Sequence, residues 1–191
     1  PPLTFAGLRY ALAFLVLLPL VLLNPARRAV LCRLSRADWL RLLALGVVYY
    51  AITQGAQFIA LARLPSATVS LFLNFSAVTI ALLGLFFLGE RLSGLQWVGM
   101  VLSLAGAVVY LHPVAFPAAQ VAGVIAVVTG MLANSVGSVL GRAINRDGAL
   151  PPLVVTAVSM GTGALLMLAL GLLTEGWPAL TGQSWLLIAA L

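Results

Sequence analysis

Two long apolar runs separated by a short polar break constrain the fold of this chain most. The first run covers Ser66–Leu88 and the second covers Gly94–Leu111. About 20 apolar residues of α-helix cross the roughly 30 Å hydrocarbon core of a bilayer, so each run predicts a transmembrane helix. In the break, Gly89 can take the left-handed conformation that ends a helix, and Ser93 with Gln96 forms a capping-box pattern that begins the next one. The sequence therefore predicts a helical hairpin with its turn at the membrane surface.

Composition extends this conclusion to the rest of the chain. Hydrophobic residues make up 63% of the 191 residues, charged residues make up 7%, and the mean hydropathy is +1.16. So few charges cannot cover the surface of a soluble domain, so we expect an all-α fold, a polytopic membrane helix bundle. With one His and one Cys, neither a metal site nor a cofactor is expected.

The apolar runs predict about six complete spans and the start of a seventh. They cover residues 4–23, 39–61, 66–88, 94–111, 121–140 and 152–173, and a seventh begins at 185. If the links alternate between the two sides, one side holds Arg63 and the other holds Arg27, Arg28, Arg33, Arg36, Arg41, Arg91, Arg142 and Arg146. Positive charge is retained in the cytoplasm, so we expect the second set to be cytoplasmic, and nucleic-acid binding is a poorer explanation of the net charge of +6. A chain without an initial Met that ends inside an apolar run is expected to be a fragment.

A weak internal repeat relates the two parts of the sequence. Pro-Pro-Leu occurs at residues 1 and 151, and Trp-Leu occurs at residues 39 and 185. Five spans separate the members of each pair, so the paired spans cross the membrane in opposite directions. This pattern is typical of the inverted-topology repeats of secondary transporters, whose substrate site lies between the halves near the midplane.

The segment LGERLSGLQWVGMVLSLAGAVVYL resembles the helix-turn-helix of the EamA-like transporter family of the drug/metabolite transporter superfamily. In that family a span ending Leu-Gly-Glu is followed at once by a short, Gly-rich span. FAGLRYALAFLVLLPL is similar to the family's second helix, and LARLPSATVSLFLNFSAVTIALLGLFFLGE is similar to its fourth. The resemblance implies inverted five-helix repeats, with the later four helices of the first in residues 1–111 and the truncated start of the second in 121–191.

The resemblance also implies a function. It predicts a secondary-active permease that exports small metabolites, amino acids or drug-like compounds by alternating access. Such a protein would be a multi-pass protein of the plasma or inner membrane whose partners are a small-molecule substrate and the lipid bilayer, without nucleic acid. An intramembrane enzyme and a non-transporting structural subunit are the alternatives. We do not expect an enzyme, because all four acidic residues lie at span ends or in links and no Gly-x-Ser-x-Gly occurs.

Polar residues inside the spans are the candidate substrate-binding residues. Arg9 lies roughly 7 Å from the outer end of its span, where it either snorkels to the headgroups or lines an outward-opening cavity. Tyr50, Gln54 and Gln57 share one face of the second span at i, i+4 and i+7, and polar side chains of the third span share another. Asn134 is the polar member of a small-residue face in the fifth span. The alternative role of these polar side chains is hydrogen bonding between helices. For substrate binding we expect the following set to converge on one central space: Arg9, Tyr50, Gln54, Gln57, Asn74 and Asn134. No catalytic residue is expected.

Small-residue stripes predict where helices pack closely. One stripe in the fifth span holds Gly123, Gly130, Gly137 and Gly141, and one in the fourth holds Gly99, Ser103 and Gly106. Glu90 and Arg91 lie in the surface turn of the hairpin, where we expect a structural role. We expect Phe86, Leu95 and Leu166 to face lipid.

Overall fold

The computed structural model describes residues 2–112, 117–146, 148 and 150–177. Within them the regular elements are all helical, in the order α1 (Pro2–Leu22), α2 (Pro25–Cys32), α3 (Arg36–Leu45), η1 (Gly46–Ile52), α4 (Thr53–Leu61), α5 (Ser66–Leu88), α6 (Gly94–Leu111), α7 (Ala118–Arg146) and α8 (Pro152–Thr174). The continuous unit α3–η1–α4 and the helices α1, α5, α7 and α8 are long and apolar enough to cross a membrane, and α6 is a shorter apolar helix. The predicted all-α membrane bundle is confirmed. The predicted seventh span lies outside the described residues.

The helix ends follow local signals in the sequence. Gly89 ends α5 with a φ of 65°, and Ser93 and Gln96 form the predicted capping box at the start of α6. Ser35 and Asp38 form a second capping box, which begins α3 at Arg36, slightly before the predicted start at residue 39. These short-range contacts fix where α3 and α6 begin and where α5 ends.

Two helical segments differ from the predicted pattern. The link after the first span contains the short helix α2, whose N-cap Asn24 accepts a hydrogen bond from the backbone N–H of Arg27 and whose first residue is Pro25. Helix α7 continues to Arg146, although the predicted span ended at residue 140. The last turns of α7 are polar, so they lay outside the apolar run from which the span was predicted.

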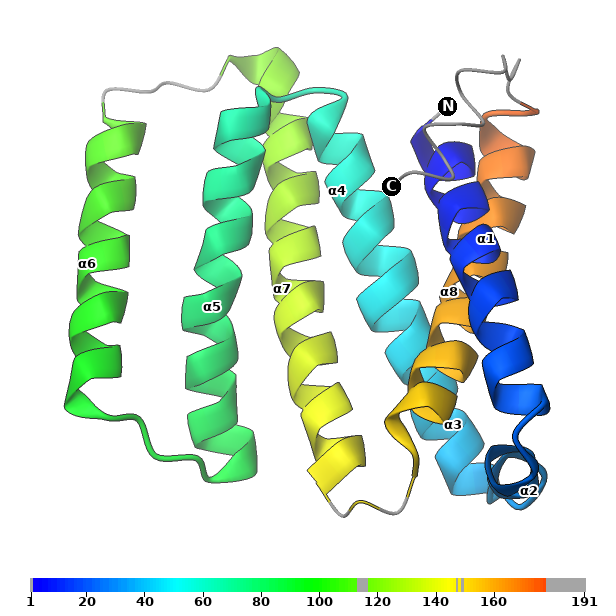
Figure 1. The fold of residues 1–191 in the computed structure, drawn as a ribbon. Coiled ribbons are helices and arrows are strands. Elements are labelled where there is room, and N and C mark those ends of the chain that lie inside the picture. Colours follow the sequence, from blue (N-terminus) through cyan, green and yellow to red (C-terminus); the bar gives the residue numbers. More distant parts are fainter. Residues whose placement is uncertain (1, 113–116, 147, 149, 178–191) are drawn as a thin grey trace.

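Successive long helices run up and down across the bundle (Figure 1). Helix α2, the α5–α6 turn, the C-terminal end of α7 and the N-terminal end of α8 lie at one end, and the α4–α5 link, the C-terminal end of α6 and the N-terminal end of α7 lie at the other (Figure 1). We call the first end the arginine-rich end, because Arg28, Arg91 and Arg142 belong to it. This alternation agrees with the predicted grouping of the links.

Helix α7 lies between α4 and α5, while α1 packs along α8, and α8 contacts η1 (Figure 1). One buried cluster joins α4, α5 and α7 through Ala60, Val69 and Val127. Another joins α1 and α8 through Val21 and Val154. Helix α6 stands at the edge of the bundle, is exposed over most of its surface and makes its few contacts mainly with α5 (Figure 1).

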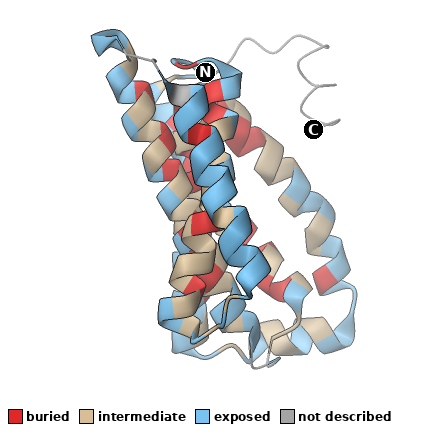
Figure 2. Ribbon diagram, turned by 90° about the vertical axis from the view of Figure 1, so that its left-hand side faces the viewer, coloured by how far each residue is buried: buried red, intermediate tan, exposed pale blue. Residues whose placement is uncertain are grey.

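The outer surface of the bundle is apolar and exposed, as lipid contact requires. Figure 2 shows exposed residues along the outer faces of the helices, and buried residues between helices. Phe86 is 76% exposed, Leu95 is 82% exposed and Leu166 is 39% exposed, in agreement with their prediction as outward-facing positions. Hydrocarbon tails can cover such faces without leaving polar groups unpaired.

Glu175 joins the ends of α1 and α8 at the end opposite the arginine-rich end. Its carboxylate accepts hydrogen bonds from the backbone N–H groups of Leu3, at 3.0 Å, and Thr4, at 3.1 Å. The hydroxyl of Thr4, which is fully buried, donates to the same carboxylate at 3.2 Å. An acidic side chain therefore satisfies first-turn donors of α1, where the helix dipole favours negative charge.

The two small-residue stripes have different outcomes. In α7, a Cβ added at Gly137 would lie 2.7 Å from Cδ2 of Tyr49, and one at Gly123 would lie 2.8 Å from Cγ of Leu64, so the predicted close packing is confirmed. In α6, no described atom lies within 4 Å of a Cβ added at Gly99 or Gly106. The prediction of close packing is therefore wrong for α6 among the described residues, because none of the described helices covers that face.

Candidate functional site

The second span changes its helical geometry at its middle. The segment η1 is π-helical, so its backbone forms wider turns than the α-helices on either side. The hydroxyl of Thr53 donates to the carbonyl of Val48 at 2.9 Å. This segment packs closely against α8. A side chain at Gly163 would collide with Tyr50, and a Cβ at Gly46 would lie 2.5 Å from the carbonyl oxygen of Ser159. Such π-helical turns occur frequently at functional sites.

A cavity of about 340 Å³ opens beside η1. It lies between the second span, α7 and α8, and polar and apolar side chains line it: Leu45, Tyr49, Tyr50, Gly137, Ser138, Gly141, Arg142, Asn145, Val155, Thr156 and Ser159. The lining offers hydroxyl groups, one amide and one guanidinium, and it contains no carboxylate. Glu90 lies outside this lining but pairs with the guanidinium of Arg142. A site of this kind suits a small polar molecule.

An aromatic series connects the cavity wall with Arg9. The guanidinium of Arg9 lies 5.5 Å from the ring centroid of Tyr10. The Tyr10 ring meets Tyr50 edge-on at 5.6 Å, and Tyr50 meets Tyr49 in the same way at 5.3 Å. Edge-on ring pairs and a cation over a ring are both attractive, so these contacts hold the two tyrosines of η1 in place.

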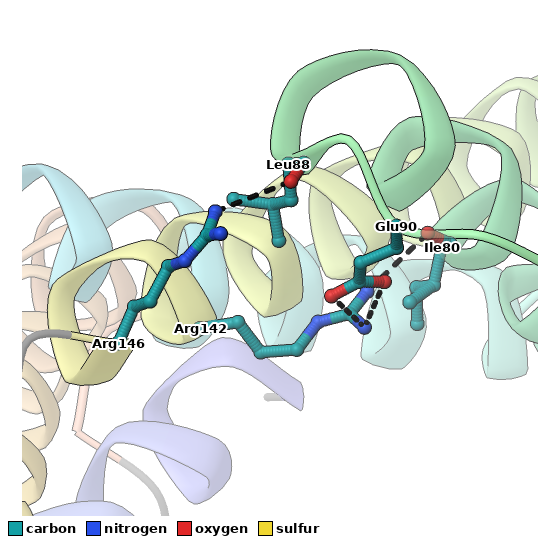
Figure 3. A network of polar contacts seen from close by, with 5 residues as sticks. All are labelled: Ile80, Leu88, Glu90, Arg142 and Arg146. Carbon is teal, nitrogen blue, oxygen red and sulfur yellow. Dashed lines mark hydrogen bonds and ion pairs between the residues drawn. The ribbon is translucent and has the colours of Figure 1, made fainter.

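An ion pair lies at the arginine-rich end of the cavity (Figure 3). Nη1 of Arg142 donates to both carboxylate oxygens of Glu90, at 2.8 and 3.0 Å, and Nη2 donates to the carbonyl of Ile80 at 3.3 Å. Gly84 makes room for the carboxylate, because a Cβ there would collide with it. The pair therefore links the Leu-Gly-Glu turn after α5 with the last turns of α7.

A second hollow, of about 450 Å³, lies at the arginine-rich end itself. Its lining includes Leu88, Glu90 and Arg146, and it shares Arg142 and Asn145 with the cavity beside η1. These two shared side chains therefore border both spaces. The side chains of Arg142 and Glu90 are 42% and 38% exposed, and a pair so exposed contributes roughly 0–1 kcal/mol to stability.

The candidate substrate-binding residues occupy different surroundings. Tyr50 lines the cavity, while the lining does not include the other five. Arg9 and the amides Gln54, Gln57 and Asn134 are half-buried, and Asn74 on α5 is exposed. The binding roles of all six residues stay predictions.

Other polar residues of the site were not among the predicted set. Ser138, Arg142 and Asn145 lie at positions i, i+4 and i+7 of α7, the same spacing that singled out the second-span stripe, so their pattern could have identified them. Ser135 bonds across to Thr79 of α5 and donates to the carbonyl of Met131 at 2.8 Å. This contact is a hydrogen bond between spans rather than part of the cavity.

Comparisons with known proteins identify the family. No curated protein sequence matches the chain. A solved crystal structure of a protein is similar over 100% of this chain, with 28% sequence identity and a TM-score of 0.74, and the chain spans 64% of the length of that structure. The model of the EamA-like transporter family matches residues 1–111, more than half of the sequence. The chain therefore belongs to the EamA-like transporter family and is a multi-pass membrane protein of a transporter family.

Proposed function

We propose that this protein is a secondary-active permease of the plasma or inner membrane that exports small metabolites, amino acids or drug-like compounds by alternating access. The cavity between η1, α7 and α8 carries this proposal. Its walls come from both predicted repeats, since η1 belongs to residues 1–111 and the two other helices belong to residues 121–191. Placement of a site between repeats is the arrangement that alternating access uses.

Alternating access also requires a closure that can open. Arg142 borders both the cavity and the hollow at the arginine-rich end, and Glu90, which pairs with it, lines the hollow. We expect this end to be cytoplasmic. Because the pair is exposed and contributes little to stability, a small change in helix position is enough to break it. We propose that it closes the cavity toward the cytoplasm.

The cavity indicates a substrate class as well. Its volume of about 340 Å³ lies at the small end of the range of roughly 300–1,000 Å³ for ligand pockets. The lining offers hydroxyl and amide groups for hydrogen bonds, and Glu90 balances the charge of Arg142. We therefore expect neutral polar metabolites to be transported better than charged ones.

Directional flux tests the proposal. The protein is reconstituted into lipid vesicles, and uptake of radiolabelled neutral, acidic and basic amino acids is measured in both directions. We expect saturable flux that Tyr50→Ala lowers strongly, because the aromatic wall of the cavity is lost. Phe86→Ala, on the exposed outer surface, is the matched control and should transport normally. Flux no greater than in protein-free vesicles for every compound would leave the structural-subunit alternative.

A further inference from the structure

Two hollows on the surface between α5 and α7 adjoin one another at Leu88. One is the polar hollow of the arginine-rich end, with Arg142 and Arg146 in its lining (Figure 3). The other is an apolar groove of about 290 Å³, lined by Leu83, Phe87, Leu88, Val136, Val139, Leu140 and Ala143. A charged hollow next to an apolar groove has the two parts that recognise a lipid headgroup and its acyl chain.

The lengths of the helices place this junction at headgroup level. Helix α5 has 23 residues and α7 has 29, so at 1.5 Å per residue they extend about 34 and 43 Å, beyond the roughly 30 Å of hydrocarbon. Because arginines collect at this end, we expect the last turns of α7, with Arg142 and Arg146, to lie at the level of the lipid phosphates. We expect the groove beside Val139 to lie within the hydrocarbon, and Phe87 in its lining is 76% exposed.

The charges of the hollow determine which headgroup fits. Arg142 is already engaged by Glu90, whereas Nη1 of Arg146 donates to the carbonyl of Leu88 at 3.2 Å (Figure 3). A guanidinium has five N–H donors, and Arg146 is exposed. Its guanidinium can therefore also donate hydrogen bonds to a phosphate. Two arginines and one glutamate leave one positive charge, which complements the single negative charge of a phosphodiester.

We propose that this junction is a binding site for an anionic phospholipid. The phosphate contacts Arg146, and one acyl chain lies in the groove between α5 and α7. A zwitterionic lipid would bring a quaternary ammonium next to two arginines, so the site prefers phosphatidylglycerol to phosphatidylcholine. Basic hollows between spans on the cytoplasmic side are suited to such headgroups.

Native mass spectrometry of the purified protein in detergent tests the site. Phosphatidylglycerol and phosphatidylcholine with identical acyl chains are added in equal amounts, and the fractions of protein carrying each lipid are compared. We expect wild type to prefer phosphatidylglycerol about tenfold, Arg146→Gln to lose most of this preference and Arg146→Lys to keep part of it. Arg28→Gln, an exposed arginine of α2 at the same end, is the matched control and should keep the preference.

Two further arms separate the parts of the site. Ala143→Phe fills the groove without changing charge, so it should weaken phosphatidylglycerol binding, with unchanged circular dichroism showing that the helices remain. Excess inorganic phosphate should not displace the lipid, because phosphate lacks the acyl chain; displacement would assign the site to free phosphate. Equal binding of the two lipids by wild type, or an undiminished preference in Arg146→Gln, would overturn the proposal.

Discussion

Helices α7 and α6 carry stripes of the same kind of small residue, but only that of α7 is covered by described neighbours. Bulky side chains meet the α7 stripe, with Tyr49 over Gly137 and Leu64 over Gly123. The α6 stripe has exposed glycines at positions 99 and 106, and α5 packs on another part of its surface. A missing Cβ permits two helices to approach, but a complementary side chain on the neighbour is what stabilises the contact.

The largest expected effect comes from adding bulk to the packed stripe. Gly137→Leu forces its side chain into Tyr49, so we expect the free energy of unfolding to fall by about 1–3 kcal/mol, or more if η1 cannot shift. The side chain of Gly106→Leu in α6 meets open space, so this variant should change the free energy of unfolding by less than about 0.5 kcal/mol. Thermal unfolding in detergent measures both. Equal losses for the two variants would show that α6 is packed as tightly as α7.

The second prediction uses the polar continuation of the α7 face, which lines the cavity. In a Cys32→Ser background, Ser138→Cys places a thiol in the cavity wall. A charged thiol reagent is added to inside-out vesicles, and the rate at which it labels this cysteine is measured. We expect Glu90→Gln to raise the labelling rate up to about fivefold, because the closing ion pair contributes up to about 1 kcal/mol.

The double variant Glu90→Arg with Arg142→Glu restores an ion pair with reversed charges. Its labelling rate should return toward that of the unmodified pair. Identical rates in all three backgrounds would show that Arg142 and Glu90 do not close the cavity.

The smallest expected effect concerns the hydrogen bond between α5 and α7. Ser135→Ala removes the contact with Thr79, and we expect a loss of about 0.6 kcal/mol in the free energy of unfolding, the average for such bonds between membrane helices. Ser103→Ala lies on the exposed face of α6 and should have no measurable effect. Thermal unfolding of both variants provides the comparison, and an equal loss at Ser103 would place a partner on α6.

Much of the fold could be predicted from the sequence because its signals are local. Span length, the left-handed Gly89 and the capping box at Ser93 each depend on residues close together in the chain. The pair of Glu90 and Arg142 could not be predicted, because it depends on which face of α7 turns toward α5. The α7 glycine pattern identified a contact face but not its neighbour.

The candidate site was harder to predict, because a cavity forms where several helices fail to fill the space between them. Tyr50 was identified as a polar residue inside a span, and it lines the cavity. Thr156 and Ser159 lie at i and i+3 of α8, with Gly163 at i+7, but this small and polar face is short within a long apolar helix. Asn74 satisfied the same polar-residue argument as Tyr50 but lies exposed on α5.

The wide turns of η1 also shift the phase of the second span. An α-helix advances about 100° per residue, and a π-helical turn accommodates about one additional residue, so everything after η1 is rotated by roughly that angle relative to an uninterrupted helix. Tyr50 lies within η1, whereas Gln54 and Gln57 follow it. The three residues were predicted to share one face on the assumption that the span is an uninterrupted α-helix. Because of the π-helical segment, side chains of α4 point in a different direction from those at the corresponding positions of α3. A single span therefore presents two differently oriented surfaces to its neighbours.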